Sequence, residues 1–249
     1  MDNLFTSKFW IALRHPFSSQ KRKAARKEIS DAIEAERFKL FHQLAPQALL
    51  DLSATIKAYN KPVNMWLEFG TLLGAYRERG IIAHDSDLDV GIDERDFTPE
   101  FIQHLMKYGF KPLRNYTIKS TDAAIDGFLA EYTFQYKDAV NIDFFVFKTV
   151  GPHKICFSFD VEEGLSVKST LKKYHQHLRA IQIQLNDFGL VKSEFLGGTF
   201  LIPDNTAEHL AEVYGPDFMT PKAYSYENRI KDYEVLLDTD TLGKPKFFS

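Results

Sequence analysis

The stretch that decides the fold is residues 66–92, WLEFGTLLGAYRERGIIAHDSDLDVGI. Its pattern predicts a strand, a Gly-Thr turn that opens a short helix, a loop, and a second strand that carries Asp87 and Asp89. Side chains alternate along a strand, so these two carboxylates point to the same face. A glycine turn that leads into a helix presents backbone N–H groups to an anion. Paired acids beside such a turn predict phosphoryl or nucleotidyl transfer.

Three acids are the candidate ligands of a divalent metal. Mg²⁺ prefers hard oxygen ligands, and two same-face carboxylates joined by a third from a neighbouring strand could hold one or two ions about 3.5–4 Å apart. Asp143 is the natural third ligand, because it lies inside the apolar run VNIDFFVF. A lone carboxylate is costly to bury there without a metal or another cation. We therefore expect Asp87, Asp89 and Asp143 to bind Mg²⁺ or Mn²⁺.

A calcium loop or a plain acidic turn is the alternative for these aspartates. Asp85, Asp87 and Asp89 match positions one, three and five of an EF-hand loop. However, Gly91 falls at position seven instead of six, and Asp96 occupies the position of the bidentate glutamate. These two mismatches argue against an EF-hand.

The expected phosphate cradle consists of Gly70, Thr71 and Arg77. Backbone amides at Gly70 and the Thr71 hydroxyl could face a phosphate opposite the metal, although most Gly-Thr turns only end a strand. Arg77 lies about two turns along the same helix, and arginine suits bidentate phosphate binding, although most exposed arginines are only solvated. Asp85 stands at the strand entrance and could orient a nucleophile, act as a base or cap the turn.

Composition excludes several classes of protein. The 249 residues are 44% apolar and 26% charged, which is typical of a soluble globular protein. A net charge of −3 argues against a dedicated nucleic-acid binder. The lone cysteine, Cys156, excludes an internal disulfide framework and a multi-cysteine zinc site, and favours a reducing compartment. We find no apolar run near the roughly 20 residues that a membrane-spanning helix needs.

Two parts of the chain differ in character. Residues 1–27 form a basic aromatic segment, with seven Lys or Arg residues and no acid between Asn3 and Lys27. Such a segment could contact anionic lipid headgroups peripherally, or it could be a solvated lead into a helix. Residues 28–249 are predicted to form one α+β domain, since no repeat or low-complexity linker interrupts them.

Hydrophobic spacing predicts the remaining elements. Residues 21–59 have helical spacing, with a second helix expected to begin near Pro46. Further helices are predicted at 70–78, 101–108 and 167–188, and one capped by Asp204 or Asn205 and ending at Gly215. Strands are predicted at 63–69, 81–92, 116–118, 128–136, 140–147, 155–159 and 195–202, and the tail after Pro221 is expected to be irregular.

Three blocks of the chain, FGTLLGAYRERGIIAHDSDLDVGI, NIDFFVF and EVYGPDFMTP, resemble the LicD/fukutin-like phosphotransferases. This family lies in the nucleotidyltransferase superfamily of the DNA polymerase β type, and the likeness covers roughly residues 66–226. The resemblance implies an α+β fold with a nucleotidyltransferase-like mixed β-sheet flanked by helices. It also implies N-terminal helices and a C-terminal helical extension.

The resemblance further implies a metal-dependent transferase with a CDP-linked donor. Asp87, Asp89 and Asp143 would bind Mg²⁺ or Mn²⁺, and Asp85 would be an accessory acid. Donor phosphates would contact the residues of the expected cradle, Gly70, Thr71 and Arg77. The hydroxyl of a glycan or lipid-linked glycan would attack the phosphorus that bears an alditol or choline, and CMP would leave, so catalysis would be positioning plus charge stabilisation.

Departures from the family pattern concern the substrate more than the metal. His84 stands where many LicD-type members carry Trp, and Ser86 replaces an acid of their aspartate run. The multi-cysteine zinc site of fukutin-related protein and a Golgi-type membrane anchor are both absent from the sequence. We therefore expect a cytoplasmic enzyme of bacterial type that serves surface polysaccharide or teichoic-acid-like synthesis, held at the inner face of the membrane by its basic segment.

Two other functions stay open at the level of sequence. A true nucleotidyltransferase of the same fold would attach a nucleoside monophosphate to a small molecule or protein and release pyrophosphate. A non-catalytic binding module would keep the fold without the chemistry. Retention of Asp87, Asp89 and Asp143 together argues against the binding module.

Overall fold

A computed structural model describes residues 18–162, 164–221, 234–236 and 240–248. By its internal contacts the chain divides into two units, Met1–Gln43 and Leu44–Ser249. Residues 1–17 of the predicted basic segment lie outside the described residues, so its membrane contact stays a prediction. In the described part of the chain, no helix has both the length and the apolar character needed to cross a bilayer.

Helix α2 (Ser19–Lys57) contains Pro46 in its interior, so the predicted start of a second helix near this residue is wrong. Proline removes one backbone hydrogen bond and normally kinks or ends a helix. Here Ala45, Ala48, Leu49 and Leu52, on both sides of the proline, are fully buried. Burial of this apolar stretch keeps the helix continuous across the proline.

The decisive stretch has the predicted order of strand, turn, helix, loop and strand, but residues 81–86, predicted as the start of the second strand, belong to the loop. Strand β1 (Met65–Leu67) leads into helix α3 (Phe69–Leu73), which continues as the π-helical turn η1 (Gly74–Glu78) and is followed by strand β2 (Asp87–Asp93). β1 and β2 pair antiparallel, with Trp66 opposite Gly91. A side chain at Gly91 would lie within 2.3 Å of the Trp66 ring, so only glycine fits beneath this indole. The strand, turn and helix therefore form one rigid corner.

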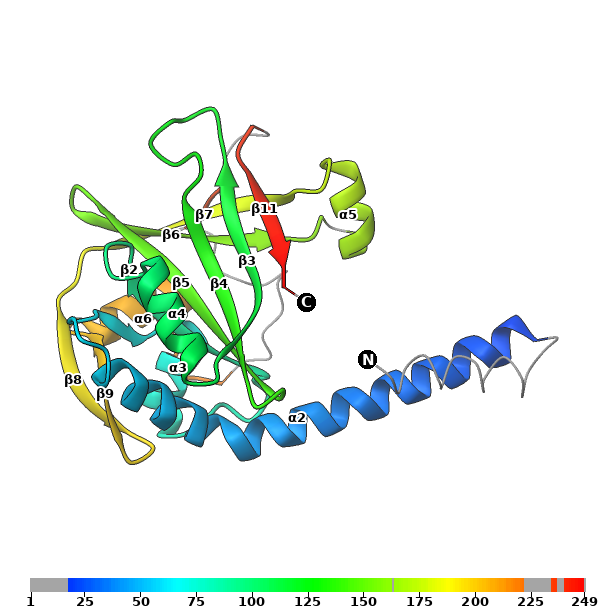
Figure 1. Ribbon diagram of the computed structural model, residues 1–249, viewed down its shortest axis with the longest axis horizontal. Coiled ribbons are helices and arrows are strands. Elements are labelled where there is room, and N and C mark those ends of the chain that lie inside the picture. Colours follow the sequence, from blue (N-terminus) through cyan, green and yellow to red (C-terminus); the bar gives the residue numbers. More distant parts are fainter. Residues whose placement is uncertain (1–17, 163, 222–233, 237–239, 249) are drawn as a thin grey trace. The chain divides into compact units, whose positions relative to one another are not determined.

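A closed ring of six antiparallel strands makes up most of the sheet (Figure 1). Its members, in spatial order, are β3 (Lys111–Lys119), β4 (Leu129–Tyr136), β5 (Val140–Val150), β6 (His153–Asp160), β7 (Leu178–Asn186) and β11 (Leu242–Phe247). β11 pairs with both β3 and β7 and thereby closes the ring. In Figure 1, β6 and β7 run across β3, β4 and β5 at a steep angle.

The second part of the sheet is mixed and extends from β5. β2 pairs parallel with β5, β1 pairs antiparallel with β2, and β9 (Gly198–Pro203) pairs parallel with β1. β8 (Leu190–Phe195) forms a hairpin with β9, and the short β10 (Glu234–Leu236) pairs with β7. The α+β class is thus confirmed, but the expected mixed sheet is only one part of an architecture dominated by the closed antiparallel ring.

The predicted helix at residues 167–188 is wrong over most of its length. Ser166 caps a short helix α5 (Val167–Lys173), and positive φ angles at His175 and Gln176 end it before β7 begins. The segment Ile181–Leu185 alternates apolar and polar side chains, which is the period of a half-buried strand. This alternation overrides the helical spacing that the same apolar residues also satisfy.

One further prediction needs correction, and another is untested. The strand predicted at residues 195–202 is interrupted by a tight turn at Leu196 and Gly197, both with positive φ, as two-residue hairpin loops require. The predicted C-terminal helical extension would lie in the tail after α6 (Thr206–Tyr214), where residues 222–233 and 237–239 are outside the described residues, so it stays a prediction; the described tail forms regular structure only as the strands β10 and β11. The predicted end of that last helix at Gly215 is confirmed by its φ of 92°.

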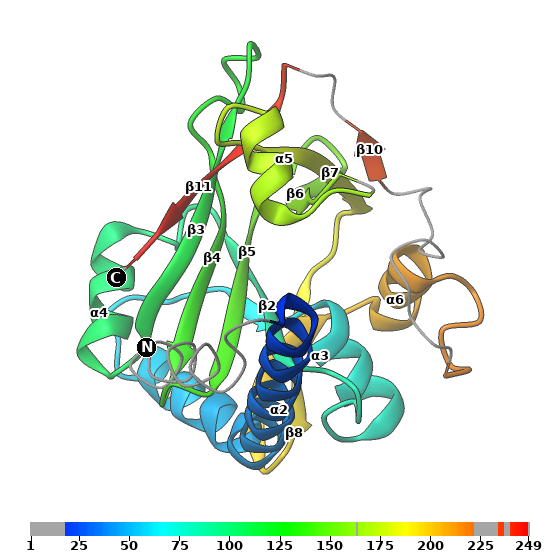
Figure 2. The ribbon, with the colours of Figure 1, turned by 90° about the vertical axis from the view of Figure 1, so that its right-hand side faces the viewer.

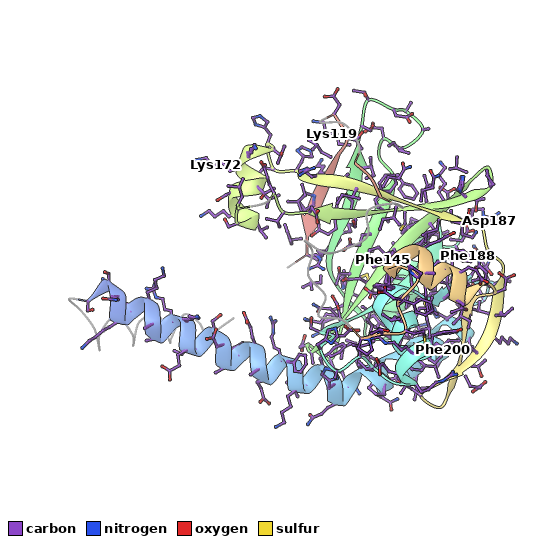
Figure 3. All side chains as sticks on the ribbon, turned by 180° about the vertical axis from the view of Figure 1, so that it is seen from behind. Lys119, Phe145, Lys172, Asp187, Phe188 and Phe200 are labelled. Carbon is purple, nitrogen blue, oxygen red and sulfur yellow. The ribbon has the colours of Figure 1, made fainter. Side chains whose placement is uncertain are left out.

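Aromatic side chains pack on both faces of the central strands. Helix α4 (Pro99–Lys107) is capped by Thr98, and Phe97 before it stacks on Phe144 of β5 at 5.5 Å. On the other side, Trp66 and Phe188 belong to a cluster with Phe147, Cys156 and Val213. Figure 3 shows Phe188 and Phe145 in this crowded region, while Lys119 and Lys172 lie at the periphery. This packing holds β2 and β5 in a fixed position.

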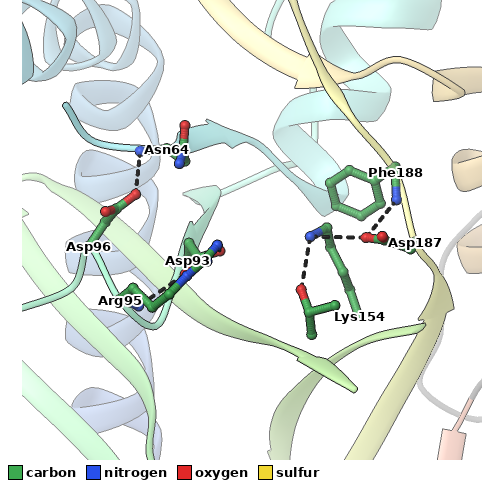
Figure 4. Close-up of polar contacts among 8 residues, drawn as sticks. Asn64, Asp93, Arg95, Asp96, Lys154, Asp187 and Phe188 are labelled. Carbon is green, nitrogen blue, oxygen red and sulfur yellow. Dashed lines mark hydrogen bonds and ion pairs between the residues drawn. The ribbon is translucent and has the colours of Figure 1, made fainter. Parts of the chain in front are cut away.

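Polar contacts hold residues near the start of β1, the end of β2 and the segment after β7 (Figure 4). Arg95 binds both carboxylate oxygens of Asp93 at 2.7 Å, just after β2. Lys154 of β6 lies 3.1 Å from Asp187 and over the ring of Phe188. These contacts pair every drawn carboxylate with a donor, so we assign them to stability.

Candidate metal and phosphate site

The candidate site lies on a row of residues that crosses four adjacent strands. Asp89 of β2 is opposite Asp143 of β5, which is opposite Thr133 of β4, which is opposite Arg114 of β3. Figure 2 shows β3, β4 and β5 side by side, with β2 next to β5. Because side chains alternate, this row lies on the face opposite Phe144 and the α4 contact. Asp87 lies on the same face, two residues before Asp89.

Asp143 is buried, and both of its carboxylate oxygens accept hydrogen bonds. The Thr133 hydroxyl donates to one oxygen. The Arg114 guanidinium donates to the other at 3.4 Å and also lies 3.9 Å from the carboxylate of Glu131. Asp143 and Glu131 are only 5% and 7% exposed. A lone acid in an apolar strand is therefore compensated here by a hydroxyl and a shared arginine.

The glycine turn contacts the acids directly. The Gly70 N–H donates to a carboxylate oxygen of Asp89 at 3.0 Å, and the Asp89 N–H donates to the Thr71 hydroxyl at 2.8 Å. A Cβ built on Gly70 would lie 3.1 Å from carboxylate oxygens of both Asp85 and Asp89. A side chain at position 70 would therefore force these carboxylates to shift away from the backbone of the turn.

The carboxylates at the site are buried and close together, and both effects raise their pKa values. Burial raises the pKa of Asp89 well above its usual range, and the charges of Asp87, Asp143 and Asp85 raise it further. Burial also raises the pKa of Asp87, against the opposing charge of Arg114. The pKa of Asp143 rises to about 6 because of burial, although Arg114 and Thr133 oppose the shift. A concentration of mutually repelling acids favours a bound cation.

The donor set has the chemistry of a hard divalent cation, because it consists of carboxylate oxygens from two adjacent strands. In the described part of the chain, no three His, Cys, Asp or Glu side chains are arranged to hold a metal ion as they stand. Both oxygens of Asp143 already accept hydrogen bonds, one from Thr133 and the other from Arg114. The residues therefore fit such an ion in kind, and Asp143 would have to exchange a partner to bind it.

The structure brings some of the predicted site residues together, and it gives the other two, Thr71 and Arg77, different contacts. Asp85, Asp87, Asp89, Asp143 and Gly70 are brought together. Thr71 is 4% exposed, and its hydroxyl accepts the amide of Asp89, so it supports the acid strand from below.

Arg77 makes its contacts elsewhere, away from the row that contains Asp89 and Asp143. Its guanidinium binds the backbone carbonyl of Phe218 at 2.9 Å and the carboxylate of Glu78 at 2.7 Å, and its side chain is only 10% exposed. Tyr76 also contacts the Phe218 ring at 5.9 Å. The π-helical turn is thereby tied to the GPDFMT segment, so these two blocks, far apart in the sequence, are in contact in the fold.

A buried pair missed by sequence reasoning supports the turn from behind. Glu68 accepts the N–H of Phe69 at 3.1 Å, the indole N–H of Trp66 at 2.6 Å, and lies 2.6 Å from His209 of α6. The Glu68 amide in turn donates to the backbone carbonyl of Asp89 at 3.2 Å. The available signal was a single acid within the apolar run WLEF, the same signal that identified Asp143. Its partner, 141 residues away, had no signal in the sequence.

Arg114, Glu131 and Thr133 were also missed. Glu131 lies in the apolar run LAEYTFQY, and burial raises its pKa to about 8 in spite of Arg114. A search for acids inside apolar strands would have found Glu131. Arg114 and Thr133 have no such signal, because only the pairing of β3, β4 and β5 brings them to the site.

Comparisons with known proteins show which family this chain resembles. Residues 62–205 match the family model described as LicD/FKTN/FKRP, nucleotidyltransferase domain. The chain is 28% identical over 186 residues to ribitol-5-phosphate transferase FKTN of Mus musculus, covering 75% of this chain and 34% of that protein. Its identity to the Homo sapiens protein of the same name is 30% over 174 residues, covering 70% of this chain and 33% of the other.

A shorter match links the chain to a bacterial protein. It is 56% identical over 34 residues to the uncharacterized protein RP689 of Rickettsia prowazekii, covering 14% of this chain and 13% of that one. The chain spans about a third of the length of the ribitol-5-phosphate transferases it matches.

Proposed function

This chain belongs to the LicD/FKTN/FKRP family of nucleotidyltransferase domains, and we propose on that premise that it is a metal-dependent phosphotransferase. It moves an alditol-phosphate or phosphocholine-type group from a CDP-linked donor to a hydroxyl of a glycan or lipid-linked glycan, and CMP leaves. Ribitol phosphate is the first group to test, since the matched relatives carry that name. A cytoplasmic setting in surface-polysaccharide synthesis, near the membrane, belongs to the same proposal.

One observation supports the proposal most: Asp89 and Asp143 lie opposite each other on parallel strands, and the Gly70 amide reaches the same cluster. Asp87, Asp89 and Asp143 would hold Mg²⁺ or Mn²⁺, which supplies charge for the phosphates of the donor. Asp85, beside Gly70, would position the acceptor hydroxyl or take its proton. The strands β5, β2 and β1 with α3 would correspond to the nucleotidyltransferase-like core that the family description implies.

The remaining residues of the proposed site hold other groups in place. Thr71 holds the Asp89 backbone, Thr133 holds the Asp143 carboxylate, and Glu68 holds the turn that precedes Gly70. Once the metal is bound, substrate phosphates would lie beside carboxylates whose positions these contacts fix. Such preorganised electrostatics accounts for most of the rate in phosphoryl transfer. Arg77 would act through the Phe218 segment, and a direct phosphate contact would require it to leave the carbonyl.

A nucleotidyltransferase is the second candidate, because the matched model is described as a nucleotidyltransferase domain. Such an enzyme would release pyrophosphate, whereas the phosphotransferase releases CMP. The deciding experiment incubates the protein with CDP-ribitol, CDP-glycerol or CDP-choline, or with nucleoside triphosphates. Each donor is tested with Mg²⁺ or Mn²⁺, with and without glycan acceptors, and both by-products are measured. CMP release that depends on acceptor supports the proposal, and pyrophosphate release supports the second candidate.

A matched pair of variants assigns the activity to the site. Asp89→Asn should lower turnover on the order of 1,000-fold, which corresponds to about 4 kcal/mol of transition-state stabilisation. Asp138→Asn is the control, because Asp138 is 71% exposed at the turn between β4 and β5. Near-normal turnover in Asp89→Asn would contradict the site assignment. Neither product, and no Mn²⁺-dependent thermal shift with CDP compounds, would favour a non-catalytic binding module.

A further inference from the structure

Arg114 is a cation that the structure places against the acid row, and neither the sequence nor the family match assigns it a role. It approaches Asp143 at 3.4 Å and Glu131 at 3.9 Å. It also lies close enough to Asp87 to oppose the rise in the pKa of that group. Its guanidinium therefore neutralises part of the charge that a metal would neutralise.

The path of the Arg114 side chain depends on its neighbour. β3 and β5 are separated by β4, which puts their backbones roughly 10 Å apart. Thr133 occupies the intervening position and is completely buried beneath this path. Because threonine is small, the long arginine side chain can pass over it and reach Asp143.

Arg114 has features of a group that can change partners. Its side chain is 31% exposed, whereas its carboxylate neighbours are almost inaccessible. Its contacts with the two acids are long, and its buried Nε has no hydrogen-bond partner among the described residues. Two acidic side chains thus share one guanidinium, and neither holds it in the short bidentate geometry that makes such pairs strong.

We propose that Arg114 is an exchangeable counter-ion of the site. In the metal-free protein it neutralises Asp143. When Mg²⁺ or Mn²⁺ is present, Arg114 leaves Asp143, stays near Glu131, and binds the diphosphate of the CDP-linked donor. The inference rests on the proposed function, since it needs a metal at Asp143 and a diphosphate donor. The planar fork of arginine suits a diphosphate, and Arg77 cannot serve without giving up Phe218.

The test measures Mn²⁺ binding and CDP binding separately, by calorimetry on the full chain. Arg114→Gln removes the competing cation, so it should bind Mn²⁺ alone roughly tenfold more tightly and, at saturating Mn²⁺, bind CDP roughly tenfold more weakly. Lys111→Gln is the matched control, because it removes an exposed cation from the same strand. It should change neither affinity. Weaker or unchanged Mn²⁺ binding in Arg114→Gln would overturn the exchange.

A second variant provides the test if Arg114→Gln does not fold. Arg114→Lys keeps the charge but loses the fork, so Mn²⁺ affinity should stay near that of the parent protein while CDP affinity falls. Unchanged CDP affinity in Arg114→Lys would overturn the diphosphate contact.

A crystal structure with Mn²⁺ and CDP gives the direct readout. The distance from Arg114 to Asp143 should exceed the limit of an ion pair, about 4 Å, and an unchanged contact would refute the exchange. If the parent protein binds no Mn²⁺ at all, the proposed function fails together with this inference. Parent-like Mn²⁺ and CDP affinities in Arg114→Gln would refute the role of Arg114 alone.

Discussion

Replacing His209 with alanine tests whether the buried pair behind the glycine turn stabilises the protein. His209 and Glu68 are 1% and 0% exposed and lie 2.6 Å apart. After the substitution, Glu68 keeps two donors, the Trp66 indole and the Phe69 amide. The carboxylate is therefore left under-compensated rather than isolated.

The expected loss follows from two contributions. A hydrogen bond to a charged group is worth about 1.5–3 kcal/mol. Removing the imidazole also leaves a cavity against Phe188, whose ring lies 4.9 Å away and nearly perpendicular. That cavity adds about 1–2 kcal/mol. The sum, about 3–5 kcal/mol, matches the usual cost of breaking a buried pair, and at about 2–4 °C per kcal/mol it lowers the Tm by roughly 10 °C.

Urea unfolding and thermal melting measure this loss in the full chain. Glu208→Ala is the control, since Glu208 is the exposed neighbour of His209 on α6 and should cost only a few tenths of a kcal/mol. His209→Gln, which can still donate to Glu68, should recover part of the stability. If His209→Ala costs no more than Glu208→Ala, the pair does not stabilise the turn and the reasoning is refuted.

Three further outcomes are expected. The pKa of Glu131 is raised from 4.5 to about 8, so between these pH values the native state retains a proton that the unfolded chain has released. The contribution of this group to the free energy of unfolding is complete below pH 4.5 and is lost as the pH rises towards 8. Glu131→Gln should therefore flatten the decline of stability with pH, measured by urea unfolding without metal. Gly70→Ala places a Cβ 3.1 Å from an Asp89 oxygen and should weaken Mn²⁺ binding measured by calorimetry, with little change in Tm; unchanged affinity would contradict the close approach. Gly91→Ala sets a Cβ 2.3 Å from the Trp66 ring and should destabilise by about 1–3 kcal/mol in thermal melts, because a rigid indole cannot yield without repacking.

Several features were predictable because they depend on neighbours in the sequence. The period of a strand puts Asp87 and Asp89 on one face wherever that strand lies. The Gly-Thr turn and the helix after it follow from local backbone preferences, and so does the end of α6 at Gly215. The charge argument at Asp143 is local as well, since a lone acid in an apolar run needs a partner of some kind.

Local patterns failed where two periods compete or where burial decides. The apolar residues of 178–186 satisfy a helical spacing and a strand alternation at once, and pairing with β6 selects the strand. Pro46 would end an isolated helix, but buried neighbours keep α2 intact.

The sequence by itself determined the acids, the turn and the chemistry they suggest. Only the tertiary structure decided that β11 closes a ring, that Arg114 reaches over Thr133 to Asp143, and that His209 supports Glu68. The physical reason is that side-chain direction is set by the dihedral angles of a few residues. The partners of a strand or a buried charge are set instead by burial summed over segments far apart in the chain.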